Sequence, residues 1–331
     1  MLGEWYQKDK GYQENSAILQ KSGNWTMKEK RINRMKAEYI TPAVTLFNEA
    51  GKPDYENLGK LYEHLIAGGV SGILVLGSIG EFFAISKEDG EGIIEFAARK
   101  IKGRVKLFVG TNRMVPGETV ALSNYALKCG ADGVVIVPPY YFPLTQDSIY
   151  DFYAETARKV SGDIYIYNFP DRTGYEISPQ VMVRLAKEFP NIVGCKDTIP
   201  GMAHTRDIIK QMKPVRPDFK VYSGFDDNFA HNVLSGGAGC IGGLSNVIPQ
   251  FFKAWMDAFE REDLAEISRR QEMIDRLMDI YNVGVPFVPY IKAAMKAMGI
   301  ISCDKATFPL PAASKEDIQE LLEILGREAE I

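Results

Sequence analysis

The sequence predicts a (β/α)₈ barrel with a C-terminal helical extension, and two observations indicate this fold. Short apolar, β-branched segments alternate eight times with longer amphipathic segments, which is typical of repeated strand–helix units. The strand segments are apolar throughout, as expected for parallel strands that are covered on both faces. A doubly wound sheet fits less well, because the repeat count is eight and no GxGxxG sequence follows the first strand.

The strands and helices of the barrel are expected in strict alternation. We expect strands at residues 39–46, 72–76, 105–110, 133–137, 164–168, 191–195, 219–223 and 239–242. We expect helices at residues 54–68, 86–102, 117–129, 146–160, 178–189, 201–212, 226–235 and 247–260. Residues that favour helix starts support several of these helices: Ser86 with Asp89, Pro116, and Ser178 with Pro179.

The two ends of the chain differ from the repeated part. Beyond the barrel, which we place at residues 37–261, only helical patterns occur, at 262–281, 286–298 and 315–328. Residues 262–331 are therefore predicted to be a helical region that covers the flank of the barrel or forms an oligomer surface. Residues 1–36 are polar and lack the apolar stretch of a secretory signal, so we interpret them as an N-terminal extension, with Met27 as a candidate start.

Composition and charge exclude several classes of protein. The 331 residues are 46% hydrophobic and 25% charged, with a net charge of -4, which is ordinary for a globular enzyme without a nucleic-acid or membrane partner. The four cysteines are far apart, which predicts reduced thiols in a cytoplasmic protein. The histidines are scattered, so we expect no metal site, and we expect no cofactor.

Lys196 is the most informative residue for function. It follows the apolar strand 191–195, where burial would favour the neutral amine, a nucleophile toward ketones. Tyr167 stands at the matching position near the end of the preceding strand. The position of Lys196 therefore indicates Schiff-base chemistry. The alternative is a lysine that extends from the strand end to the adjacent carboxylate of Asp197.

Other polar groups are predicted to converge on the same end of the barrel, because catalytic groups lie at the carboxyl ends of the strands. A Schiff-base lyase that acts on a 2-keto acid needs a phenol for proton transfer, relay hydroxyls and sites for carboxylates. Tyr167, Ser78 and Tyr141 suit the proton transfer. The backbone N–H groups of the turn from Gly77 to Gly80 suit the keto-acid carboxylate, and Arg172 suits a second carboxylate.

Each of these groups also has a simpler interpretation when it is taken alone. The glycine-rich segment 77–80 is by default a tight turn, and the tyrosines at 140 and 141 are by default core aromatics. Arg172 beside Asp171 is by default a surface ion pair. Asp226 and Asp227 are by default an acidic pair at a helix N-terminus. Their joint placement at strand ends favours a functional site.

Five segments together resemble one enzyme superfamily: GSIGE (77–81), PPYY (138–141), YNFPDRTG (167–174), GCKDT (194–198) and GFDD (224–227). Their order and spacing are similar to those of dihydrodipicolinate synthase and N-acetylneuraminate lyase from about residue 38 to 300. The resemblance implies a class I pyruvate-dependent (β/α)₈ lyase that forms a homotetramer, a dimer of dimers.

The resemblance also implies a role for individual residues. It makes Lys196 the Schiff-base lysine, Tyr167 the proton donor and acceptor, and Ser78 a relay hydroxyl. Tyr141 matches the tyrosine that a neighbouring subunit donates to the relay. Ile79 and Ile241 match positions that contact the pyruvate moiety, and Gly80 belongs to the carboxylate-binding turn.

The substrate is predicted to be pyruvate or another 2-keto acid together with an aldehyde. The run YNFP…KDTI…AHTR…GFDD is similar to 2-keto-3-deoxygluconate-type aldolases, so we favour a 2-keto-3-deoxy sugar-acid aldolase. The alternative is 4-hydroxy-tetrahydrodipicolinate synthase, because Arg172 stands where that enzyme binds aspartate semialdehyde. A non-catalytic keto-acid-binding regulatory protein and a phosphosugar enzyme are further hypotheses, the latter from the glycines at 236–243.

Overall fold

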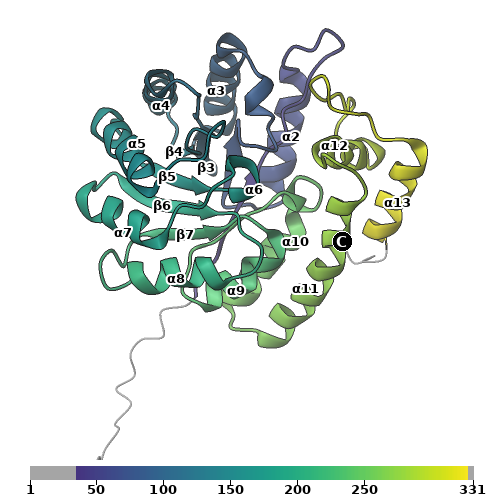
Figure 1. Ribbon diagram of the computed structural model, residues 1–331. Helices are drawn as coiled ribbons and strands as arrows, with labels where there is room; N and C mark the ends of the chain where they lie inside the picture. The colour runs from purple at the N-terminus through teal and green to yellow at the C-terminus, as the bar shows by residue number, and fades with distance from the viewer. Residues whose placement is uncertain (1–34, 327–331) are drawn as a thin grey trace, which may run out of the picture. The chain divides into compact units, whose positions relative to one another are not determined.

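A closed barrel of eight parallel strands is the central feature of the computed structural model, which describes residues 35–326 (Figure 1). Each strand pairs with its neighbours in chain order, and β1 pairs with both β2 and β8, which closes the sheet. The predicted (β/α)₈ fold is confirmed. The strands are β1 (Glu38–Pro42), β2 (Gly72–Val75), β3 (Lys106–Gly110), β4 (Gly133–Ile136), β5 (Ile164–Asn168), β6 (Ile192–Asp197), β7 (Lys220–Ser223) and β8 (Gly239–Ile241).

Amphipathic helices surround the barrel and lead the chain from the end of one strand to the start of the next (Figure 1). Two predicted helix starts are confirmed by side-chain caps: the hydroxyls of Ser86 and Ser178 accept from backbone N–H groups three residues later. The helices are α2 (Tyr55–Ala67), α3 (Lys87–Ile101), α4 (Pro116–Cys129), α5 (Gln146–Lys159), α7 (Pro179–Glu188), α8 (Ala203–Met212), α9 (Phe229–Leu234) and α10 (Pro249–Glu260).

The first strand is shorter than the predicted range 39–46, because β1 ends at Pro42. The Ala43 N–H still donates to the Leu74 carbonyl of β2 at 2.9 Å, but polar groups outside the sheet bind the buried residues 44 and 45. The Val44 N–H donates to the side-chain carbonyl of Asn246 at 3.1 Å, and the Thr45 hydroxyl donates to the Gly80 carbonyl at 2.7 Å. An apolar run predicts burial, and here burial continues after the ladder of strand hydrogen bonds has ended.

Four one-turn helices in the loops after strands were not predicted, because a single turn is too short to show a helical period. They follow β2, β5, β7 and β8, at the end of the barrel where functional groups are expected. They are η1 (Phe82–Ala84), α6 (Pro170–Thr173), η2 (Asp226–Asn228) and η3 (Leu244–Asn246).

The C-terminal part is helical as predicted: α11 (Leu264–Leu277), η4 (Met278–Asn282), α12 (Val288–Ala297) and α13 (Lys315–Gly326). Figure 1 shows α11, α12 and α13 together at one side of the barrel, next to α10. The division of the chain at residues 36 and 261 stays a prediction, since residues 1–34 and 327–331 lie outside the described part. No helix within residues 35–326 is long and apolar enough to cross a membrane.

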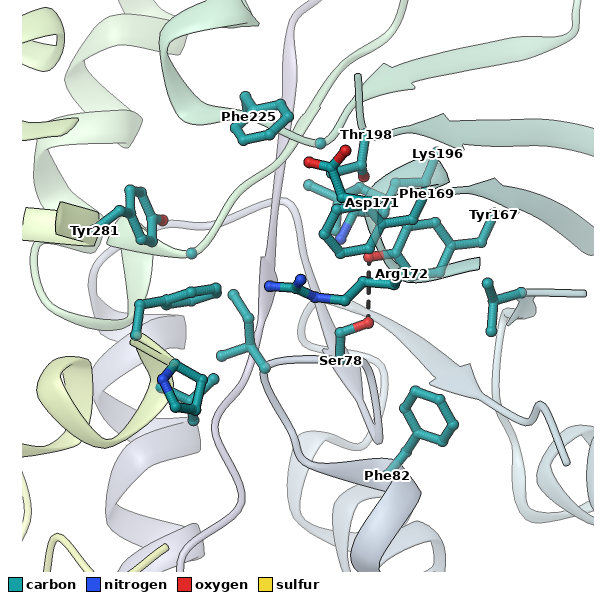
Figure 2. A pocket seen from close by; sticks show the side chains of 18 of the residues that line it. Ser78, Phe82, Tyr167, Phe169, Asp171, Arg172, Lys196, Thr198, Phe225 and Tyr281 are labelled. Atoms are coloured by element: carbon teal, nitrogen blue, oxygen red, sulfur yellow. Dashed lines mark hydrogen bonds between the residues drawn. The ribbon is translucent and has the colours of Figure 1, made fainter. Parts of the chain in front are cut away.

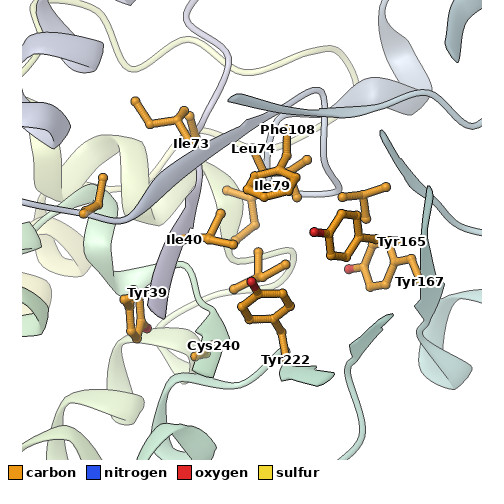
Figure 3. Close-up of a cluster of buried hydrophobic side chains, with 14 of the residues drawn as sticks. Tyr39, Ile40, Ile73, Leu74, Ile79, Phe108, Tyr165, Tyr167, Tyr222 and Cys240 are labelled. Carbon is orange, nitrogen blue, oxygen red and sulfur yellow. The ribbon is translucent and has the colours of Figure 1, made fainter. Parts of the chain in front are cut away.

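An aromatic layer fills the barrel toward its amino-terminal end (Figure 3). Tyr165 lies two residues before Tyr167 on β5, so both side chains face the interior, in successive layers. The rings of Phe108 and Tyr222 lie 5.2 and 6.2 Å from that of Tyr165. The Tyr222 hydroxyl donates to Glu38 at 2.5 Å. Because these side chains fill the amino-terminal part of the barrel, a ligand can enter only at the carboxyl ends of the strands.

Candidate active site

A pocket of about 660 Å³ lies at the carboxyl ends of the strands (Figure 2). It collects side chains from the loops after β2, β4, β5, β6, β7 and β8, together with groups from the C-terminal helical region. Six of the predicted site residues line it: Ser78, Ile79, Tyr167, Arg172, Lys196 and Ile241. Segments that are far apart in the sequence therefore meet in one cavity.

Lys196 faces this pocket from the interior of the barrel, with only 4% of its surface exposed. Its Cα is paired with that of Tyr167 across β5 and β6, and its Nζ lies 4.6 Å from the centre of the Tyr167 ring. Within the described residues, no carboxylate lies within 4.0 Å of the Lys196 Nζ atom. The alternative interpretation, a lysine that extends outward to Asp197, is therefore wrong.

Asp197 instead faces the opposite side of the sheet, because successive side chains of a strand alternate between its two faces. Its carboxylate accepts hydrogen bonds from the side chains of Asn168 at 2.7 Å and Thr205 at 2.6 Å. The Nδ1 atom of His204 lies 3.0 and 3.1 Å from its two oxygens. These partners bind Asp197 outside the barrel, and within residues 35–326 no carboxylate pairs with Lys196 inside it.

Tyr167 and Ser78 are in contact across the pocket. The Tyr167 hydroxyl lies 3.3 Å from Ser78 Oγ, and either atom could be the donor (Figure 2). The ring of Tyr167 is 4% exposed and stacks on the ring of Phe169 at 5.8 Å. A phenol, a hydroxyl and an amine therefore lie together, and this arrangement suits the transfer of a proton at a carbon next to the amine.

The turn that carries Ser78 has an unusual backbone. Leu76 and Glu81, at its two sides, adopt φ angles of 56° and 55°, which is the left-handed region that non-glycine residues rarely occupy. Within the described residues, the N–H groups of Ser78, Ile79 and Gly80 donate no hydrogen bond. Such N–H groups can donate to a carboxylate.

Arg172 lies in the one-turn helix α6 and extends across the pocket opening (Figure 2). Its guanidinium carbon lies 5.4 Å from the centre of the Phe169 ring. Within the described residues it forms no ion pair, so the predicted surface pair with Asp171 is wrong. The guanidinium is held over an aromatic ring and keeps its donors available to an anion.

Two predicted residues do not line the pocket. Gly80 has its carbonyl bound to Thr45, and a Cβ at this position would lie 3.1 Å from the Ala43 carbonyl oxygen, so a side chain does not fit there. Tyr141 is 78% exposed, and its ring packs edge-on against Phe142. Tyr140 lines the pocket from this segment instead. The roles of Gly80 and Tyr141 stay predictions.

Several pocket residues were not predicted. Asp226 was interpreted as one of two acidic residues at a helix N-terminus, but its carboxyl group is buried and accepts from the hydroxyls of Tyr39 and Tyr281 and from two backbone N–H groups. Burial raises the pKa of Asp226, against the effect of these donors. The Thr198 hydroxyl is buried and has no hydrogen-bond partner in the described part of the chain. Tyr281 comes from η4, and no sequence signal connects that segment with the strand ends.

Metal ligands do not gather in this pocket. Across residues 35–326, no group of three or more His, Cys, Asp or Glu side chains is arranged to hold a metal ion. His204 binds Asp197 on the outside of the barrel, and His64 and His231 lie on α2 and α9.

Comparison with known proteins agrees with this fold. Residues 35–328 match the model of the Dihydrodipicolinate synthetase family. The probable 2-dehydro-3-deoxy-D-pentonate aldolase YjhH of Escherichia coli (strain K12) is 34% identical over 277 residues, which cover 84% of this chain and 92% of the relative. A 4-hydroxy-tetrahydrodipicolinate synthase of Kosmotoga olearia is 36% identical over 262 residues, which cover 79% of this chain and 88% of the relative.

A solved structure of this family is also similar to the chain. The crystal structure of YagE, a prophage protein of the dihydrodipicolinic acid synthase family from Escherichia coli K12, was determined in complex with pyruvate. It matches with a TM-score of 0.86 and 31% identity, covering 89% of this chain and 98% of that chain.

Fold and site together define a (β/α)₈-barrel enzyme of the lyase class. The chain belongs to the dihydrodipicolinate synthetase family. The predicted superfamily and the predicted enzyme class are confirmed, and the hypothesis of a non-catalytic regulatory protein is wrong.

Proposed function

We propose that the protein is a class I aldolase in which Lys196 forms a Schiff base with pyruvate. The observation that carries this proposal is the position of Lys196: buried in a pocket, without a carboxylate partner among the described residues, and beside the Tyr167 phenol. The lysine nitrogen adds to the keto carbon, and the keto oxygen leaves as water. The protonated imine then accepts the electron pair of a C3–H or C3–C4 bond.

Tyr167 and Ser78 serve the proton transfers of this reaction. Condensation removes a proton from C3 of the imine and adds one to the aldehyde oxygen, and cleavage runs through the same transfers in reverse. Tyr167 is placed to exchange protons with Ser78 through the 3.3 Å contact. The N–H groups of Ser78 and Ile79, which meet no acceptor within the described residues, bind the carboxylate, while Ile79 and Ile241 contact the methyl end of pyruvate.

We favour a 2-keto-3-deoxy sugar-acid aldolase, for which the second product is a small hydroxyaldehyde. The relative YjhH, named as a pentonate aldolase, supports this choice. A hydroxyaldehyde would also give a partner to the buried Thr198 hydroxyl, which has none within residues 35–326. A panel of aldehydes with pyruvate, read by product mass, tests the choice; products from apolar aldehydes alone would contradict it.

The second candidate is 4-hydroxy-tetrahydrodipicolinate synthase, which condenses pyruvate with aspartate semialdehyde. Arg172 favours it, because a guanidinium at the pocket opening suits the second carboxylate of that substrate. The Kosmotoga olearia relative carries this name. The same aldehyde panel, with aspartate semialdehyde included, separates the two candidates.

Exchange of the pyruvate C3 protons with deuterium, followed by NMR, tests the proposal without knowledge of the aldehyde. Lys196→Ala should reduce the exchange to the rate of free pyruvate, because the imine cannot form. Tyr167→Phe should still form the imine but slow the exchange by about 10²–10⁴-fold, as expected for loss of a general acid–base group. Substantial exchange by Lys196→Ala would refute the assignment.

A further inference from the structure

A polar cluster lies on the outer side of the barrel wall, directly behind Lys196 and Tyr167. We call Asn168, Asp197, His204 and Thr205 the Asp197 cluster. Asn168 follows Tyr167 on β5, and Asp197 follows Lys196 on β6. Asn168 is paired with Asp197 across the two strands, as Tyr167 is with Lys196. The Asn168 side chain donates to Asp197 at 2.7 Å, and the Asn168 carbonyl accepts from the Thr198 N–H at 2.9 Å. The cluster therefore joins the two strand ends that carry the proposed catalytic pair.

Hydrogen-bond direction in this cluster is fixed by the groups around it. The Ile177 N–H donates to the side-chain carbonyl oxygen of Asn168 at 3.0 Å. The side-chain amide nitrogen of Asn168 must therefore face Asp197. Thr205 donates to the other carboxylate oxygen at 2.6 Å. Asn168, Asp197 and Thr205 are each 1% exposed, so water does not replace a missing partner. Because every neighbour donates to Asp197, a carboxylate fits this position and an amide does not.

His204 completes the cluster, with hydrogen-bond acceptors at both of its ring nitrogens. Its Nδ1 faces Asp197, and its Nε2 lies 3.1 Å from the Ile177 carbonyl and 3.4 Å from the Glu176 carboxylate. A neutral imidazole has one N–H group and can donate to only one of these acceptors. The imidazolium has two N–H groups and can donate to acceptors at both ring nitrogens. Burial lowers the pKa of His204, but Asp197, Glu176 and the Ile177 carbonyl together raise it above its ordinary value.

We propose that Asp197, bound to the His204 imidazolium, is a positioning residue that holds Lys196 and Tyr167 in their relative geometry. This inference rests on the proposed function of that pair. A side chain on the outer face of a strand sets the backbone from which the inner side chains project. An error of about 1 Å in such a geometry costs on the order of 10²-fold in rate. Loss of the cluster should therefore slow the chemistry more than it weakens pyruvate binding.

Three variants test the inference through pyruvate C3 exchange in the full-length protein. His204→Ala removes the donor to Asp197, and we expect kcat to fall by about 10–100-fold while KM for pyruvate changes by less than about twofold. His204→Asn keeps an amide donor near the place of Nδ1 and should recover much of the rate. Thr205→Val removes one donor at nearly constant volume, and it remains informative if His204→Ala fails to fold.

The pH dependence supplies a readout that a purely structural role would not change. The groups that face His204 are Asp197 from β6 and Glu176 from the segment before α7. Because the pKa of His204 is raised, its positive charge is present at low pH and is lost as the pH rises through that pKa. The rate advantage of the wild type over His204→Asn should therefore decline as pH rises.

Two outcomes decide the matter. Wild-type kcat for both His204→Ala and Thr205→Val, with only a lower unfolding midpoint, would overturn the positioning role. His231→Ala, an exposed histidine of α9, is the matched control and should exchange pyruvate at the wild-type rate. If the wild type formed no borohydride-stable adduct with pyruvate, the proposed function would fail instead, so the two failures are distinguishable.

Discussion

Alternation along two paired strands explains how one short sequence provides both the proposed nucleophile, Lys196, and the residue that we propose to position it, Asp197. In β6, Lys196 faces the pocket and Asp197 faces α8. In β5, Tyr167 likewise faces the pocket, and Asn168 faces the outer side, where it binds Asp197. A lysine beside an aspartate in the sequence is thus separated from it by the barrel wall, and the buried amine keeps its nitrogen free for the substrate.

Arg172 is the residue through which the two candidate substrates can be told apart. Arg172→Ala should lower kcat/KM for aspartate semialdehyde more than for glyceraldehyde, because only the former carries a carboxylate. Hydrogen bonds to charged groups contribute about 1.5–3 kcal/mol, which is about 10–150-fold in kcat/KM. Arg99→Ala is the matched control, because Arg99 also lies over a phenylalanine ring, at 5.6 Å, but on α3 outside the pocket. Equal losses with both aldehydes would assign Arg172 a structural role.

Single residues were predictable where the strand pattern placed them, and not elsewhere. Lys196 and Tyr167 lie near the carboxyl ends of their strands, and Ser78 and Arg172 lie in the loops that follow, so their common place in a barrel follows from the fold. Asp226 also follows a strand, but its burial depends on Tyr39 and Tyr281, which are distant in the sequence. Contacts of this kind have no local signal.

Among the elements, the turn between β2 and η1 is bound to the C-terminal region through Glu81. Glu81 ends this turn in the left-handed region and is fully buried with Lys292 of α12, to which it is bound by an ion pair. The backbone N–H and the hydroxyl of Thr307 also donate to Glu81, at 2.7 and 2.8 Å. Burial lowers the pKa of Lys292, and Glu81 acts against this shift. The pair therefore links the turn of Ser78 to the C-terminal region.

Lys292→Met should destabilise the protein by about 3–5 kcal/mol, because it leaves the Glu81 carboxylate buried without its cation. The combined variant with Glu81→Gln should recover part of this loss. Denaturant unfolding at one fixed protein concentration measures both effects. Lys296, one turn later, forms an exposed ion pair with Asp304 and provides the control. Lys296→Met should lower the free energy of unfolding by less than about 1 kcal/mol. A loss for Lys292→Met as small as that of the control would contradict a role for the buried pair.

At the scale of the whole molecule, the C-terminal helices form part of the pocket wall. Met278, Tyr281, Phe287 and Leu310 line the cavity together with the loops of the barrel. The sequence pattern predicted these helices but left their place open, because an amphipathic period gives the apolar face of a helix and not its partner. A chain that lacked this region would have an incomplete pocket.

We further propose that the enzyme is a homotetramer in which Tyr141 completes the proton relay of a neighbouring subunit. Its 78% exposure and its absence from the pocket lining of its own chain support this role. Tyr141→Phe and Lys196→Ala should each be impaired in pyruvate exchange, while co-expression of the two variants should restore activity, because one site then receives both groups. No recovery, or a monomer by light scattering, would contradict the proposal.

The measurement that tests the central claim most directly is covalent trapping. The protein is incubated with pyruvate and borohydride, and the modified peptide is identified by mass spectrometry. We predict one adduct per chain, with the mass of a reduced pyruvate imine, on Lys196 and absent from Lys196→Ala. An unmodified Lys196, or an adduct formed equally on surface lysines, would contradict the assignment of this amine as the nucleophile.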